Sequence, residues 1–128
     1  MTAFFHYLIV FVGAGIGGAL RHGVNVATSR LLDSDFPYGT LFINVGGSSA
    51  IGLLAGPFAL KYDPGQSWRL FFTTGIIGGF TTFSTFSLDA VVLYERRDLV
   101  SMAVYVLASV VASILGLFAG LFIMRQLV

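Results

Sequence analysis

The chain has 128 residues, of which 56% are hydrophobic and only 10% are charged, and its mean hydropathy is +0.89. A soluble domain of this length could not cover its surface with so few polar side chains, so we expect the chain to lie in a lipid bilayer. The formal net charge of +1 argues against a nucleic-acid partner, and the absence of cysteine excludes disulfides and thiolate metal sites.

Four uncharged runs are long enough to cross the hydrocarbon core as helices, which takes about 20 residues each. They are Phe4 to Leu20, Gly39 to Leu60, Leu70 to Leu88 and Leu99 to Met124. The sequence therefore predicts an all-α membrane protein whose residues 1–128 form a single domain. Its four transmembrane helices are expected at about 4–32, 39–60, 70–94 and 99–124.

The first run is interpreted as a membrane helix rather than a signal peptide, because no Lys or Arg precedes it and no small-residue cleavage site follows it. Gly13 and Gly17 form a GxxxG pair, and similar pairs occur in the other spans, so we expect close helix packing. Arg21 lies near the end of this span, and two roles are open for it. Either its side chain extends to the membrane interface, or it draws anions into an aqueous vestibule.

Polar stripes run along the second and fourth spans. Thr40, Asn44 and Ser48 recur every four residues, which places them on one side of a helix. Ser101, Tyr105, Ser109 and Ser113 do the same in the fourth span, which Asp98 is expected to cap. Such residues either bridge helices or line a polar path. Asn44 is the most informative, because an amide in hydrocarbon costs several kcal/mol without partners.

The third run contains GGFTTFSTFS at residues 78–87, in which three phenylalanines recur every third residue beside hydroxyl side chains. The adjacent Gly78 and Gly79 predict a break in this helix within the membrane. Carbonyls freed by a break must be buried in protein, line water or hold an ion. Phenyl edges carry partial positive charge, so rings, hydroxyls and amides together suit a small anion. The alternative is that the rings only fill the core.

When Arg21 is treated as part of the first span, the other six lysine and arginine residues are equally divided between the two sides of the membrane that four spans define. Lys61, Arg69 and Arg125 lie on one side, and Arg30, Arg96 and Arg97 lie on the other. The excess that normally fixes orientation is therefore missing. Either the balance is chance, or the protein inserts in both orientations.

GGFTTFSTFS resembles the signature of the small bacterial fluoride channels, the Fluc or CrcB-type family. GTLFINVGG at 39–47 and GGALRHG at 17–23 are similar to further patterns of that family. The resemblance covers essentially the whole chain. It implies a passive fluoride-selective channel in the bacterial inner membrane, not an enzyme, built as an antiparallel homodimer of four-helix subunits with the third helix broken.

Carried over by position, the resemblance makes Phe83 and Phe86 the aromatic pair of the pores. Asn44 becomes the pore amide donor, next to Thr40 on the same stripe. Tyr105, Ser109 and Ser113 become a polar track. The family's central Na⁺, held by backbone carbonyls at the dimer axis, maps to Gly78 and Thr81. The chain departs from the family pattern at His22, where an aromatic residue is expected, and at Asp89, where a glutamate is expected. We expect Asp89 to be a helix-end residue with an arginine partner.

Two other functions remain open. A proton-coupled exporter like the small multidrug transporters is also short and dual in topology, but it needs a titratable carboxylate within the membrane. The first span has none, and Asp89 lies at the end of the third. A non-transporting membrane assembly subunit would explain the glycine pairs but not the polar stripes.

Overall fold

The computed structural model describes residues 2–60 and 65–127, and all regular elements in these ranges are helical. The chain forms α1 (Thr2–Leu31), α2 (Tyr38–Leu60), α3 (Gln66–Arg69), the π-helix η1 (Leu70–Ile77), α4 (Gly78–Phe80), α5 (Phe83–Glu95) and α6 (Leu99–Leu127). Elements α3 to α5 follow one another as the third span. Among the described residues there are four helical segments long and apolar enough to cross a membrane, as the composition predicts.

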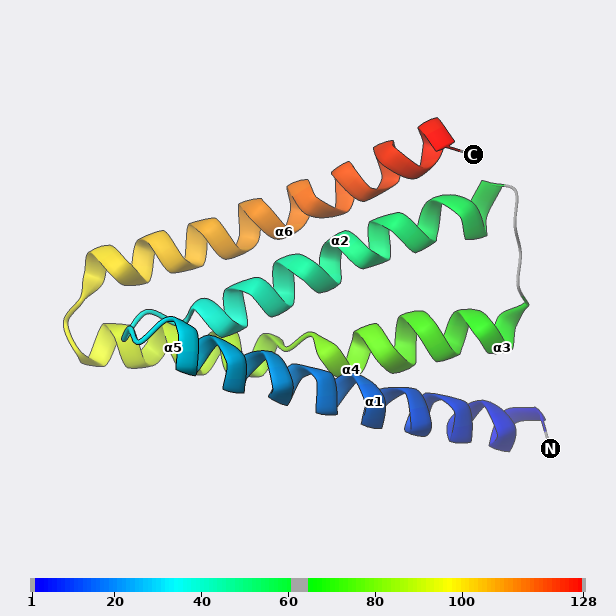
Figure 1. Cartoon of the computed structure of the whole chain (residues 1–128), viewed down its shortest axis with the longest axis horizontal. Helices are drawn as coiled ribbons and strands as arrows, with labels where there is room; N and C mark the ends of the chain where they lie inside the picture. Colours follow the sequence, from blue (N-terminus) through cyan, green and yellow to red (C-terminus); the bar gives the residue numbers. More distant parts are fainter. Residues whose placement is uncertain (1, 61–64, 128) are drawn as a thin grey trace.

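The spans lie side by side along one direction (Figure 1). Helix α6 packs along α2, and α1 packs along η1 and α4. The start of α1, the end of α2, helix α3 and the end of α6 lie at one end, while the α1–α2 and α5–α6 connections lie at the other. Asp98 caps α6 as expected, since its Oδ1 accepts a hydrogen bond from Ser101 N at 3.2 Å. At the second end, α5 lies close to the linker that precedes α2: Phe36 of the linker packs against the cluster that contains Ala90 and Leu93 of α5.

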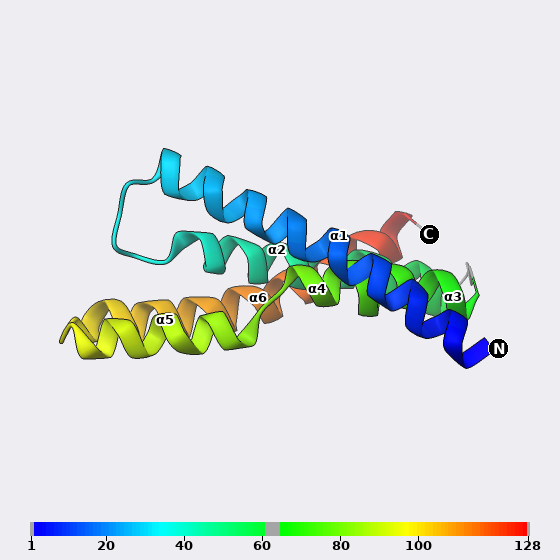
Figure 2. The same ribbon diagram turned by 90° about the horizontal axis from the view of Figure 1, so that it is seen from below.

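The third span is interrupted, but three residues later than the glycine pair predicts. Gly78 is helical, with φ −60° and ψ −38°, whereas Thr81 (φ −79°, ψ 158°) and Thr82 (φ −152°, ψ 115°) are extended. This two-residue gap separates α4 from α5 (Figure 2). Gly79 serves a different purpose, because a Cβ there would lie 2.5 Å from the carbonyl oxygen of Ala14. The glycines thus allow close packing, and the threonines form the break.

Glycines lie where α1 meets η1 and where α2 meets α6, which confirms the expected tight packing. Gly13 and Gly17 of α1 are buried, and added Cβ atoms there would collide with the backbone of η1. Between α2 and α6, a Cβ on Gly120 would lie 2.6 Å from the Ser49 carbonyl oxygen. The backbones therefore touch directly, as expected where apolar side chains alone give little reason to associate.

Candidate functional site

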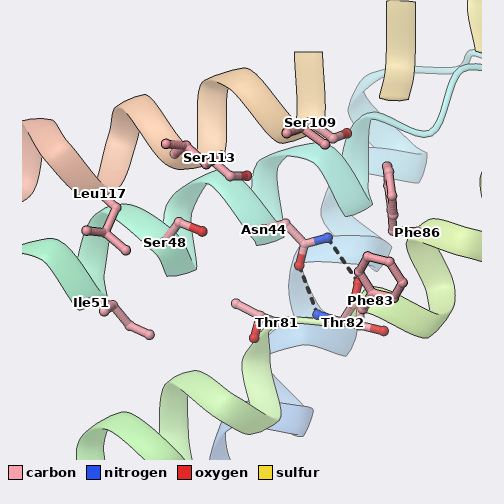
Figure 3. A pocket seen from close by; sticks show the side chains of 12 residues that line it. Asn44, Ser48, Ile51, Thr81, Thr82, Phe83, Phe86, Ser109, Ser113 and Leu117 are labelled. Atoms are coloured by element: carbon pink, nitrogen blue, oxygen red, sulfur yellow. Dashed lines mark hydrogen bonds between the residues drawn. The ribbon is translucent and has the colours of Figure 1, made fainter. Parts of the chain in front are cut away.

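A cavity of about 320 Å³ lies beside the helix break, between α2, α5 and α6 (Figure 3). None of the described residues that line it is ionisable, and they combine an amide, hydroxyls, two phenyl rings and aliphatic side chains. They are Asn44, Ser48, Ile51, Thr81, Thr82, Phe83, Phe86, Ser109, Val110, Ser113, Ile114 and Leu117.

Seven of the residues singled out from the sequence meet in this cavity: Asn44, Ser48, Thr81, Phe83, Phe86, Ser109 and Ser113. The two stripes meet because α2 and α6 pack along each other, so residues four apart on each helix face the same space. Sequence reasoning did not single out Thr82. Its only signal was its place in a Thr-Thr pair after the glycines.

The amide of Asn44 is paired with the backbone of the break (Figure 3). Its Nδ2 donates to the carbonyl oxygen of Thr82 at 3.0 Å, and its Oδ1 accepts from the amide of Thr82 at 2.9 Å. Two extended residues in a membrane helix leave backbone groups that need partners. Asn44 supplies partners for both groups of Thr82, which explains how an amide is tolerated here.

Thr82 also caps the helix that follows the break. Its Oγ1 accepts a hydrogen bond from Thr85 N at 3.1 Å, the usual geometry of a threonine N-cap. The same oxygen lies 3.3 Å from Ser84 Oγ. The cap fixes the direction of α5, and it thereby places Phe83 and Phe86 at the cavity.

The two phenyl rings differ in their surroundings. Phe83 is 77% exposed in the single chain, whereas Phe86 packs on Tyr105 with ring centroids 5.3 Å apart. The two rings are tilted by 54° at a centroid distance of 5.6 Å. Phe80 lies before the break and does not line the cavity. The three-residue phenylalanine repeat therefore does not continue as one line.

Ser109 is, with Thr82, one of the two buried polar residues among the described lining of the cavity. It is 6% exposed, and its hydroxyl has no hydrogen-bond partner among the described residues. Ser49, by comparison, donates to the carbonyl of Val45 in its own helix at 2.8 Å. A buried hydroxyl without a partner costs free energy. Ser109 is therefore poised to donate to a molecule or ion in the cavity.

Tyr105 lies beside this cavity rather than in its lining. It is fully buried, and its hydroxyl donates to Asp89 Oδ2 at 3.0 Å. The expectation for Asp89 is therefore wrong in both parts. Asp89 lies within α5 (Phe83–Glu95) rather than at a helix end, and its carboxylate accepts from the Tyr105 phenol, with no arginine paired to it among the described residues. Thr40, also buried, lines a second cavity on the side of Asp89.

Arg21 lines neither cavity. Its Nε is buried without a hydrogen-bond partner among the described residues. Both of its possible fates, at the interface or in a vestibule, stay predictions.

The break also frees the two carbonyls that the sequence singled out for a cation. In a continuous helix, the amide of Thr82 would bond the Gly78 carbonyl and that of Thr85 would bond the Thr81 carbonyl. Instead, Thr82 N donates to Asn44 and Thr85 N donates to Thr82 Oγ1. Backbone carbonyls of this kind are suitable ligands for a hard cation.

A family model described as "CrcB-like protein, Camphor Resistance (CrcB)" matches residues 8–121. The chain belongs to the CrcB family. Relatives include the "Fluoride-specific ion channel FluC" of Methylobacterium nodulans, 60% identical over 119 residues that make up 93% of this chain and 95% of the relative. The "Fluoride-specific ion channel FluC" of Rhodopseudomonas palustris is 54% identical over 121 residues, 94% of this chain and 98% of the relative.

A third relative is the "Fluoride-specific ion channel FluC 2" of Nitrobacter hamburgensis. It is 50% identical over 122 residues, which cover 95% of this chain and 98% of the relative. The CrcB match spans all four apolar helices. The chain is thus a multi-pass membrane protein of the CrcB family.

Proposed function

We propose that the chain is a passive fluoride-selective channel, not an enzyme, that exports fluoride across the inner membrane of a bacterium. The observation that carries the proposal is the cavity in which Asn44, Phe83, Phe86, Ser109 and Ser113 meet, with no ionisable group among its described lining residues. The CrcB relatives named as fluoride-specific ion channels support it independently.

The cavity offers donors that suit a small anion. The Ser109 hydroxyl has no partner among the described residues, and the Asn44 amide has a second N–H besides the one that bonds Thr82. The edges of Phe83 and Phe86 add partial positive charge. These groups replace part of the water around fluoride. Because none of them carries a full charge, the ion is also free to leave.

A second copy of the chain in the opposite orientation would complete the channel. Phe83, at the cavity, is 77% exposed in the single chain, so a pore lined by its ring needs a further wall, which a second copy would supply. The equal division of Lys and Arg between the two sides is compatible with insertion in both orientations. We therefore propose an antiparallel homodimer in which the helix break lies at mid-membrane.

Such a dimer would place the freed carbonyls of Gly78 and Thr81 of both chains next to one another. Four carbonyl oxygens would suit a Na⁺ ion with a structural role at the dimer axis. The diversion of the Thr82 and Thr85 amides to side-chain acceptors supports this assignment, because it leaves those carbonyls without their helical donors.

The same cavity disfavours a proton-coupled exporter, which needs a carboxylate where its substrate binds. Asp89 is the nearest candidate named from the sequence, but it lies outside this lining and accepts a bond from Tyr105. A non-transporting assembly subunit would not explain why the buried Ser109 hydroxyl has no partner among the described residues.

Flux from liposomes tests the proposal. Purified protein is reconstituted with fluoride inside, and efflux is followed with a fluoride electrode after a potassium ionophore relieves the charge imbalance. A channel gives fast efflux that requires the ionophore and does not depend on a proton gradient. Efflux that requires a proton gradient would instead indicate an exporter, and no efflux at all would indicate an assembly subunit.

A further inference from the structure

Gly47 of α2 lies against the helix break, three residues after Asn44 and on the same side of the helix. It is buried, and a Cβ added there would collide with Thr81 Cγ2 and would lie 3.5 Å from Phe80 Cδ2. Its neighbour Gly46 is exposed, and a Cβ added to it would meet no atom within 4 Å. The methyl group of Thr81 therefore occupies the space that a side chain at position 47 would fill.

The side chain of Thr81 is held in this orientation. Its Oγ1 donates a hydrogen bond to the Ile77 carbonyl at 3.0 Å, and its backbone amide donates to the same carbonyl at 2.9 Å. A rotation about χ1 that moves the methyl group away from α2 would break the hydroxyl bond, and β-branched side chains have few alternative rotamers. A larger residue at position 47 would therefore displace the backbone of Thr81 rather than its methyl group alone.

A displacement of Thr81 would reach the cavity through Thr82, the next residue. The backbone amide and carbonyl of Thr82 bond the Asn44 side chain at 2.9 and 3.0 Å, and such bonds weaken steeply when their geometry is distorted. Thr82 also caps α5, whose first residue is Phe83. Asn44 and Gly47 thus hold successive residues of the break, one by hydrogen bonds and the other by leaving room for a methyl group.

We propose that Gly47 is a positioning residue for fluoride conduction. Its missing side chain allows Thr81 to pack against α2, so that Thr82 reaches Asn44 and Phe83 is placed at the cavity. Gly47 itself is not among the residues that line the cavity, so it acts on the ion only through the break. The effect on efflux rests on the proposed channel function, whereas the effect on the geometry of the break does not.

Alanine at two adjacent glycines gives the first test. Gly47→Ala and Gly46→Ala raise helix propensity by the same amount, but only Gly47→Ala introduces a collision. Fluoride efflux from liposomes should fall at least about tenfold for Gly47→Ala, because overpacking displaces the break. Gly46→Ala should conduct within about twofold of the parent, as expected for an exposed substitution without contacts.

Hydrogen exchange reports the geometry of the break without reference to fluoride. Exchange of the Thr82 amide is followed by NMR in detergent, with ¹⁵N-labelled threonine. In the parent this amide is bonded to Asn44 Oδ1, so it should exchange slowly. In Gly47→Ala it should exchange at least about tenfold faster, because the bond to Asn44 is strained or lost. In Gly46→Ala it should exchange as in the parent.

A second substitution, Thr81→Ser, identifies the contact. Serine keeps the hydroxyl but lacks the methyl group that a Cβ at position 47 would meet, whereas Thr81→Val keeps a methyl group in that place. The loss caused by Gly47→Ala is measured in each background, against the single Thr81 variant. It should shrink to about twofold or less with Thr81→Ser and remain about tenfold with Thr81→Val. The exchange rate of the Thr82 amide should follow the same pattern.

Gly52→Ala controls for a general loss of stability. Gly52 also lies in α2, but a Cβ there would collide with the carbonyl of Leu117 in α6 rather than with the break. Overpacking at this crossing should lower the melting temperature in detergent, as Gly47→Ala also does. The Thr82 amide of Gly52→Ala should nevertheless exchange as in the parent.

Three results would overturn the inference. Gly47→Ala with the efflux and the Thr82 exchange of the parent would mean that the break needs no free space at α2. A loss that Thr81→Ser leaves undiminished would mean that the effect does not pass through the methyl group. Equally fast exchange of Thr82 in Gly52→Ala would reduce the effect to general destabilisation. If the parent shows no efflux while exchange follows the expected pattern, the channel function fails and the positioning of the break by Gly47 stands.

Discussion

Asn44 in α2 and Thr82 in the helix break are joined by two hydrogen bonds, one in each direction. The side-chain amide thus pairs with a backbone amide in the way that two strands pair in a sheet. This gives Asn44 a structural role in addition to the proposed contact with the anion. A substitution at this position therefore changes both the fold of the break and the chemistry of the cavity.

Asn44→Asp tests both roles at once. The carboxylate cannot donate to the Thr82 carbonyl, and a buried group left unpaired costs about 1–3 kcal/mol of stability. Its charge would also repel fluoride in a low-dielectric cavity. We expect efflux to be nearly abolished and the melting temperature in detergent to fall. Ser48→Ala, which changes the same cavity without touching Thr82, should melt like the parent. An Asn44→Asp protein with the melting temperature and the efflux of the parent would contradict both roles.

Isoleucine in place of Phe83 or Phe86 preserves an apolar side chain and removes the ring. If phenyl edges bind fluoride, each single variant should lose most of its efflux. The Phe86→Ile protein should also be less stable, because an aromatic pair with Tyr105 contributes about 0.5–1.5 kcal/mol. Phe83→Ile should elute from a sizing column like the parent. If both variants show the same efflux as the parent, the rings do not bind fluoride and only fill space in the core.

Gly17→Ala and Gly18→Ala form a matched pair in α1. A Cβ at Gly17 would collide with the carbonyl of Ile76, whereas a Cβ at Gly18 would meet no atom within 4 Å. Overpacking of this kind typically costs about 1–3 kcal/mol. Thermal unfolding in detergent should therefore show a clear loss for Gly17→Ala and almost none for Gly18→Ala. Equal melting temperatures would mean that α1 does not pack on η1 as described.

Dual topology is tested at Gln66, the exposed first residue of α3. A cysteine introduced there should be labelled in about half of the copies when intact cells are treated with an impermeant reagent. Two added lysines near this position should shift labelling toward one orientation and reduce efflux, and a copy biased in the opposite direction should restore it. Labelling close to none or to all copies of the unbiased protein, with efflux intact, would contradict the antiparallel dimer.

The sequence predicted the four apolar helices correctly, and it singled out several of the residues that line the cavity, because both depend on local periodicity. High hydropathy over about 20 residues indicates a membrane-spanning helix, and polar residues that recur every four positions lie on one side of that helix. Once α2 and α6 pack together, Asn44, Ser109 and Ser113 face the same space. No knowledge of the partner helix was needed to choose these residues.

The position of the break and the partner of Asp89 depend on contacts that are distant in the sequence. Glycine has the greater tendency to interrupt a helix, but Gly79 is required for the close approach of Ala14. The break moves to Thr81 and Thr82 because Asn44, 38 residues earlier, satisfies the exposed backbone. Similarly, Asp89 meets Tyr105 on another helix. The π-helical form of Leu70–Ile77 left no signal that composition or spacing could reveal.

The pairing of Asn44 with Thr82 also has a consequence for biosynthesis. A ribosome makes α2 before it makes the third span, and membrane segments enter the bilayer roughly in the order of their synthesis. The amide that satisfies Thr82 is therefore already in the membrane when the two extended residues arrive. If the order of the spans were reversed by circular permutation, the break would enter lipid with its backbone groups unpaired, at a cost of several kcal/mol for each group. The order in which the helices occur in the chain thus provides a partner for the backbone of the break during insertion.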